Sequence, residues 1–174
     1  TDKAAEYGLD DNAYSTHSAF LDYDRDGDLD MFLLNHSSPE YSKGGLDIFT
    51  LRNKREIEKE SKLYRNDNGK FVDVTAASGI KGNVLSLSLG LGVVDINNDG
   101  WADIFIGNDF NESDYLFMNN GDGTFTEKSK EEKDKLPVMK EMLQLKAINY
   151  ASISGKRLFI NPNMFNQSKA RLKD

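Results

Sequence analysis

The feature that most constrains this chain is an aspartate-rich stretch that occurs twice. Residues 22–35, DYDRDGDLDMFLLN, align without a gap with residues 95–108, DINNDGWADIFIGN, at an offset of 73. A second pair follows: LYRNDNGKF at residues 63–71 is similar to LFMNNGDGTF at residues 116–125. Because the same pieces recur in the same order, we expect the chain to build one structural unit twice.

Each copy is expected to form four short strands joined by tight turns. The first copy carries about 20 more residues between its matching parts, and without them the repeat length falls from 73 to 53. A repeat of about 50 residues with Asn, Asp and Gly turns is typical of a four-stranded β-propeller blade. The expected strands cover residues 18–22, 30–35, 62–66 and 70–75, then 90–95, 103–107, 115–119 and 124–128.

An insertion interrupts the first copy at about residues 37–61. It contains Arg52–Lys62, where mixed charges at helical spacing favour a solvated helix or a mobile excursion. Loops on a rigid repeat scaffold are also a common place for binding specificity. We therefore expect the insertion to be helical and to leave the strand order of the blade unchanged.

The last part of the chain departs from the repeat. Residues 127–174 hold 11 Lys and Arg against 6 Asp and Glu, whereas the residues before them hold 11 against 23. Apolar spacing indicates a helix at 137–148, and residues 156–160 have the composition of one more strand. The predicted fold is therefore mainly β, a propeller fragment of two blades at 1–127 followed by a divergent, partly helical segment at 128–174.

The spacing of the aspartates is that of a calcium loop. Carboxylates at alternate positions repel, by roughly 1 kcal/mol per pair about 5 Å apart even in water, and a divalent cation removes that repulsion. Calcium takes about six to eight oxygens, which carboxylates at positions 1, 3, 5 and 9 and a carbonyl at position 7 supply, with glycine at position 6. The expected ligands are Asp22, Asp24, Asp26, the carbonyl of Asp28, and Asp30 in one site, and Asp95, Asn97, Asp99, the carbonyl of Trp101, and Asp103 in the other.

Two other interpretations of these loops are weaker. An EF-hand needs a bidentate glutamate at position 12, where this chain has Leu33 and Ile106, and helices on both sides, where it has apolar strand-like runs. Asp, Asn and Gly are also common in plain polar turns, but two gap-free copies with every ligand position filled favour calcium. Magnesium is disfavoured because it demands strict octahedral geometry.

Composition excludes several classes of function. The chain has no cysteine, so disulfides, thiolate metal sites and a cysteine nucleophile are absent. A net charge of −7 without a basic patch in the repeats argues against nucleic-acid binding, and no apolar run is long enough for a membrane helix. The two histidines, His17 and His36, stand in no catalytic motif. We expect a protein that is not an enzyme.

These motifs resemble the FG-GAP/VCBS repeat family, and the resemblance covers about residues 1–127. The residues that carry it are 20–30, 63–66, 94–103 and 117–125. The pattern is most similar to bacterial proteins related to cartilage acidic protein, and more distantly to the integrin α-subunit propeller. The resemblance implies a β-propeller, structural calcium in the blade loops, and a secreted, periplasmic or cell-surface protein. It also implies adhesion, or contact with proteins or carbohydrates.

Three functions remain open at this point. The first is a non-enzymatic surface or adhesion module with structural calcium. The second is a subunit that assembles into a fibre or ring through unpaired blade edges, which invite pairing with another chain. The third is the non-catalytic propeller part of a polysaccharide-degrading enzyme.

Overall fold

The computed structural model describes residues 1–42, 45, 47–109, 111–128 and 132. The elements below lie in a compact unit formed by residues 1–135. The helix expected at 137–148 and the strand expected at 156–160 fall outside the described residues. Among the described residues, no helix is long and apolar enough to cross a membrane.

All eight expected strands are present, with ends that differ by a few residues. The largest difference is in the first strand, which begins at Tyr14 rather than at Ser18. The strands of the first repeat are β1 (Tyr14–Leu21), β2 (Asp30–His36), β3 (Lys62–Asp67) and β4 (Lys70–Asp73). Those of the second are β5 (Leu87–Val94), β6 (Asp103–Asp109), β7 (Tyr115–Asn119) and β8 (Phe125–Glu127).

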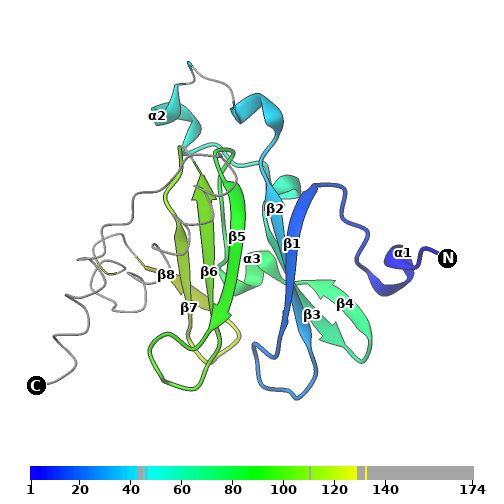
Figure 1. The fold of residues 1–174 in the computed structure, drawn as a ribbon. Coiled ribbons are helices and arrows are strands. Elements are labelled where there is room, and N and C mark those ends of the chain that lie inside the picture. The colour runs from blue at the N-terminus through cyan, green and yellow to red at the C-terminus, as the bar shows by residue number, and fades with distance from the viewer. Residues whose placement is uncertain (43–44, 46, 110, 129–131, 133–174) are drawn as a thin grey trace, which may run out of the picture. The chain divides into compact units, whose positions relative to one another are not determined.

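Each repeat forms one four-stranded antiparallel meander, as expected for a propeller blade. Strands β1 to β4 pair in chain order, and so do β5 to β8. One residue pair, His36 with Leu87, joins β2 to β5 and makes the two meanders one sheet. Figure 1 shows that the β1–β2 and β5–β6 loops lie at the same, lower edge. The mainly β, propeller-type architecture is thus confirmed.

Apolar strands fill the centre of both meanders. Strands β2, β6 and β7 are buried almost along their whole length, which fits their continuous apolar and aromatic sequences. The largest fully buried side chains of the shared core include Phe32, Leu63, Ile104 and Phe117. Burial of each such side chain contributes about 1.5–3 kcal/mol to folding.

A hydrogen-bonded Ser–Asn pair lies beside the same irregularity in both meanders. Strands β1 and β5 each contain a bulge, between Ser15 and His17 and between Ser88 and Gly90. Beside the bulge the Ser15 hydroxyl donates to the Asn35 side-chain carbonyl at 2.8 Å. The Ser88 hydroxyl donates to the Asn108 carbonyl at the same distance. The repeat is therefore conserved in hydrogen bonding as well as in strand order.

The helices are single turns that connect the strands. Helix α1 (Ala4–Tyr7) precedes the first blade and α3 (Thr75–Ser78) precedes the second. Both end at a glycine in the left-handed region, Gly8 with φ 80° and Gly79 with φ 79°. A Cβ at Gly79 would lie 3.0 Å from the Phe125 carbonyl oxygen, so this turn requires a glycine on two counts.

The insertion is helical only in short turns. It contains α2 (Ile48–Leu51) and 3₁₀ turns at Pro39–Ser42 and Ile57–Lys59, rather than a continuous helix over Arg52–Lys62. Ion pairs connect charged residues within this segment. Arg55 pairs with the buried Glu60, while Lys59 pairs with Glu56 at 2.8 Å.

Asn119 on β7 connects the two blades. Its side-chain amide donates to the Tyr23 carbonyl of the first loop at 2.8 Å and to the Ala102 carbonyl of the second at 3.3 Å. Its counterpart Asn66 on β3 donates to the Leu29 carbonyl at 3.1 Å, which is the equivalent of the Ala102 bond alone. The bond to Tyr23 is thus specific to the junction between the blades.

This difference predicts unequal losses of stability for two matched substitutions. Asn119→Ala removes the hydrogen bond to Tyr23, between the blades, and the one to Ala102, within a blade. We therefore expect the free energy of unfolding to fall by about 2–3 kcal/mol. Asn66→Ala removes only the corresponding bond within the first blade, and we expect the free energy of unfolding to fall by about 1 kcal/mol. Urea unfolding of both variants measures the difference. Equal losses would show that the Tyr23 bond does not contribute to packing of the blades.

Candidate metal centres

Both aspartate-rich stretches fold into loops with the same backbone. The first loop (residues 22–29) joins β1 to β2, and the second (residues 95–102) joins β5 to β6. In each, positions 4 and 6 lie in the left-handed region. The φ angles are 60° and 98° at Arg25 and Gly27, and 59° and 91° at Asn98 and Gly100. A left-handed turn at positions 4 and 6 curls each loop around its own carboxylates.

The ninth-position aspartates anchor both loops. Asp30 and Asp103 are fully buried, at 0% exposure. The Asp30 carboxylate accepts the backbone N–H of Tyr23 at 3.1 Å and that of Asn66 at 2.9 Å. Each such carboxylate therefore ties its loop to the hairpin that follows in the same blade.

The second loop repeats this anchor bond for bond. Asp103 accepts the backbone N–H of Ile96 at 2.8 Å and that of Asn119 at 2.9 Å. Two N–H donors offset part of the free energy that burying a carboxylate requires, but the charge itself has no ion-pair partner in these bonds. A bound cation would supply the missing compensation.

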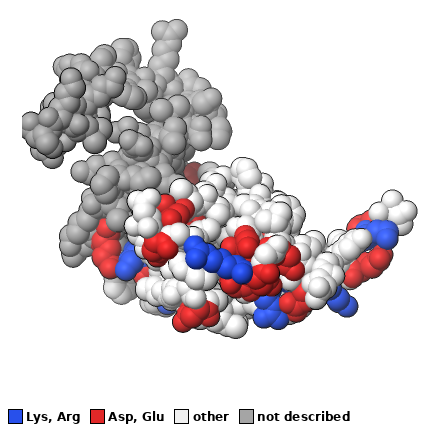
Figure 2. All heavy atoms as spheres, turned by 90° about the horizontal axis from the view of Figure 1, so that it is seen from below, with Lys and Arg blue, Asp and Glu red and all other residues white. Residues whose placement is uncertain are grey.

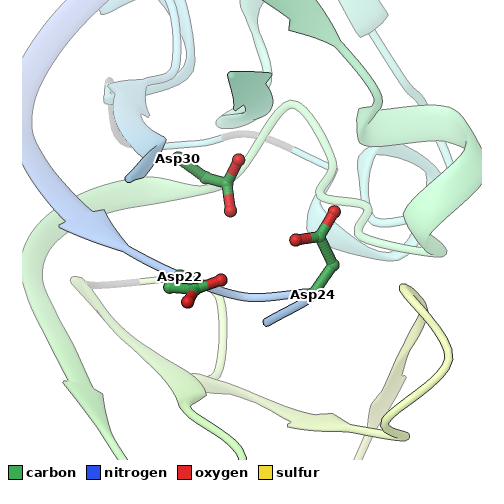
Figure 3. Close-up of side chains that lie close together, drawn as sticks. All are labelled: Asp22, Asp24 and Asp30. Carbon is green, nitrogen blue, oxygen red and sulfur yellow. The ribbon is translucent and has the colours of Figure 1, made fainter. Parts of the chain in front are cut away.

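The first loop gathers three of its expected ligands. Asp22, Asp24 and Asp30 each offer an oxygen within 4.8 Å of the others, and Figure 3 shows their carboxylates around a shared space. Among the residues that the structure describes, Asp22 Oδ1 and Asp28 Oδ1 are buried side-chain oxygens without a hydrogen-bond partner. Oxygen atoms of this kind, all acceptors, fit a hard divalent cation.

The other two expected ligands of the first loop, Asp26 and Asp28, are not part of this group. Asp26 is exposed and accepts the backbone N–H of Asp28 at 3.1 Å. Asp28 was expected to contribute its carbonyl, yet its carboxylate is the part that lies buried and unpartnered. Sequence spacing does not reveal this, because the side-chain direction at position 7 depends on the curl of the loop.

In the second loop, several expected ligands form hydrogen bonds with other residues of the same loop. Asp95 accepts the backbone N–H groups of Asp99 and Gly100, at 3.2 and 2.8 Å. The Asn97 amide donates to the Asp99 carboxylate at 2.7 Å, and that carboxylate also accepts the Trp101 N–H at 2.8 Å. The loop therefore has the expected residues in the expected order, and the oxygens of Asp95 and Asp99 accept hydrogen bonds from within the loop.

The pKa values reflect the two environments. Burial is the main cause that raises the pKa of Asp30 to about 6, with smaller contributions from Asp24 and Asp26. Burial also raises the pKa of Asp103. The pKa of Asp99 is lowered instead, by the Trp101 N–H and then by the Asn97 amide. The buried anchor positions thus resist ionisation unless a cation is near.

Sequence reasoning missed Arg25, which links the two loops. Its guanidinium donates to the Gly100 carbonyl and lies 4.0 Å from the centre of the Trp101 ring. Figure 2 shows the acidic side chains gathered on the face that carries the loops, with basic side chains between them. The one available signal was that position 4 holds an arginine in the first loop and Asn98 in the second.

A groove lies beside the first loop. It has a volume of about 490 Å³ and is lined by the loop, by β3 and α3, and by the turn between β7 and β8. Its polar side chains include Asp24, Arg65 and Asp122. It offers room for a ligand larger than an ion next to the candidate metal centre.

Comparison with known families identifies the repeat. A family model described as an FG-GAP-like repeat matches residues 43–106 and 95–132, which together span a little over half of the chain. The chain belongs to the FG-GAP repeat family. A search of curated proteins finds none that matches this chain. The closer resemblance to bacterial relatives of cartilage acidic protein therefore stays a prediction.

The pKa of Asp30 in this FG-GAP repeat predicts how stability changes with pH in calcium-free buffer. The ordinary carboxyl pKa is 3.8 and the folded value is about 6, so the folded state holds the proton more tightly between these values. The contribution of Asp30 to stability is then greatest at low pH and is lost as the pH rises through about 6.

The substitution Asp30→Asn isolates this effect. We expect wild type, melted in EGTA, to lose stability relative to Asp30→Asn as the pH rises from about 4 to about 6, and the difference to level off above that range. The asparagine variant is destabilised by a pH-independent amount, because its amide can accept only one of the two N–H groups. Parallel curves for the two proteins would contradict the assignment of a raised pKa to Asp30.

Proposed function

We propose that this chain is a calcium-stabilised FG-GAP repeat module that makes protein or carbohydrate contacts at the outside of the cell, with no enzymatic activity of its own. Calcium is structural in this proposal and occupies both loops. The observation that carries it is the convergence of Asp22, Asp24 and Asp30 in a loop whose buried oxygens lack other partners.

The residues of both loops suit calcium better than other ions. Every candidate ligand atom is an oxygen, and the chain contains no cysteine that could favour a softer metal. The first loop would hold the ion with Asp22, Asp24 and Asp30, together with Asp26 and Asp28. In the second loop the corresponding ligands are Asp95, Asn97, Asp99, the carbonyl of Trp101, and Asp103.

A bound ion would fix each loop and the strands on either side of it. The anchor carboxylates already join each loop to β3 or β7, so an ion held by the same carboxylates adds its binding free energy to folding. At about 100 times the dissociation constant, one site contributes ~2.7 kcal/mol. A chain without disulfides gains from such a brace in a calcium-rich, extracellular medium.

Thermal melts test the calcium sites directly. We expect calcium to raise the melting temperature above that in EGTA, and magnesium to raise it less. Asp26→Ala and Asp99→Ala should each lose part of the calcium-dependent rise, since each removes one ligand from a different loop. A site filled to about 100 times its dissociation constant contributes ~2.7 kcal/mol, which sets the scale of each loss.

The matched control is Asp47→Ala. Asp47 is exposed at the start of α2 in the insertion, where its carboxylate accepts from Thr50, and its removal changes the net charge by the same amount. We expect Asp47→Ala to keep the full calcium response. If all three variants respond alike, the effect of calcium is one of general charge screening, and the loop sites are refuted.

A second candidate function is assembly with further blades or chains. It is supported by large apolar side chains left exposed on the adjacent strands β1 and β5. Tyr14 and Phe20 on β1 are 55% and 56% exposed, and Leu89 on β5 is 48% exposed. Exposed large apolar side chains of this kind are candidates for contacts with another chain.

Light scattering in calcium separates this candidate from a monomeric module. Assembly predicts a mass that rises with protein concentration, and Phe20→Ser should reduce the association because it removes an exposed aromatic contact. Ile57→Ser is the control, since Ile57 is also exposed, at 67%, but lies in the insertion and not on a strand. A constant monomer mass at all concentrations would eliminate assembly of this chain with itself.

A further inference from the structure

A side chain of the first loop reaches into the second. Arg25 and Gly100 are 75 positions apart in the sequence, yet the Arg25 guanidinium donates to the Gly100 carbonyl. The same guanidinium lies over the Trp101 ring, 4.0 Å from its centre. Gly100 and Trp101 hold positions 6 and 7 of the second loop, and the carbonyl at position 7 is one of its expected ligands.

The arginine is not required by the turn that carries it. Arg25 has φ 60° at position 4 of the first loop, and Asn98 has φ 59° at the same position of the second. Asparagine adopts this left-handed conformation more readily than arginine does. The side chain at position 25 is therefore distinguished by its reach across the loops.

Trp101 is held from both sides. The guanidinium covers one part of the ring, and on another part the ring closes on Gly121, where a Cβ would lie 2.9 Å from Trp101 Cε2. A guanidinium stacked on an indole contributes about 0.5–2 kcal/mol. The position of the Trp101 main chain thus depends on where the first loop places Arg25.

From this geometry we infer that Arg25 is a positioning residue for the second metal site and couples its calcium affinity to occupancy of the first loop. The inference rests on the proposed binding of calcium by both loops. Calcium in the first loop fixes the backbone at position 4 and so fixes the guanidinium of Arg25. Through its contacts with Gly100 and Trp101, the guanidinium then orders the second loop. The second ion then meets a loop that is already ordered, so the coupling is positive.

The other bond between the loops does not reach the ligand positions. The Asn119 amide joins the carbonyls of Tyr23 and Ala102, at positions 2 and 8. Neither carbonyl belongs to the expected ligand set. Arg25, in contrast, contacts Gly100 and Trp101, the residues that place the ligand at position 7, which is the Trp101 carbonyl.

Trp101 provides the measurement, because it is the one tryptophan in the sequence. Its fluorescence during a calcium titration reports the second loop in wild type, Asp26→Ala, Arg25→Asn and the double variant. Asp26→Ala weakens the first site. Arg25→Asn installs the residue that the second loop already uses at this backbone position and removes the guanidinium.

We expect the coupling between the two calcium sites to be present in proteins with Arg25 and absent in those with Arg25→Asn. In the protein that retains Arg25, Asp26→Ala should weaken calcium binding at the second site by about five-fold or more. In the Arg25→Asn background, the same change should leave the second site unaltered. A purely structural role of Arg25 would instead weaken the second site equally with and without Asp26.

The outcomes that overturn the inference differ from those that overturn calcium binding. Calorimetry on the wild type counts the bound ions. Two ions with equal midpoints in all four proteins would refute the coupling and leave the proposed function in place. An effect of Asp26→Ala that persists in Arg25→Asn would refute the role of Arg25. Absence of any calcium response in the wild type would refute both proposals.

Discussion

The structure depends on a carboxylate buried at the start of the second strand of each blade. Asp30 and Asp103 have no exposed surface, and each accepts two backbone N–H groups from separate parts of its blade. Burial of an ionised carboxylate is costly unless hydrogen bonds and a counter-ion compensate it. The two anchor bonds fix the loop against the following hairpin, and the remaining negative charge makes a nearby cation favourable.

Much of this fold could be predicted from the sequence because its signals are local. The buried strands are continuous apolar runs, and Asn-Gly turns mark the hairpins β3–β4 and β7–β8, so strand order follows from the chain itself. Loop membership of the aspartates follows from the spacing around Gly27 and Gly100. The insertion was less predictable, since one of its charged residues, Arg52, pairs with Glu112, which lies 60 positions away and is brought near only by the fold.

Contacts between the blades could not be predicted in the same way. Asn66 and Asn119 occupy matching positions, and the sequence does not distinguish them, yet the second alone donates to the neighbouring loop at Tyr23. Arg25 is likewise one more charged residue in an acidic stretch until the fold places it over Trp101. Pairings of this kind depend on the distance between loops, which is set by how the strands are packed.

The two loops differ in how many of their side-chain oxygens accept hydrogen bonds from within the loop. The four aspartates of the first loop and Asp30 are all acceptors when ionised, so they cannot bond to one another, and Oδ1 of Asp22 and Oδ1 of Asp28 stay without partners. The second loop has Asn97 at position 3, and its amide donates to Asp99. One exchange of a carboxylate for an amide therefore gives the second loop a donor that the first loop lacks. The loop with the unpartnered oxygens is also the one that carries Arg25, so an ion bound there, as we propose, would order a side chain that contacts the other loop.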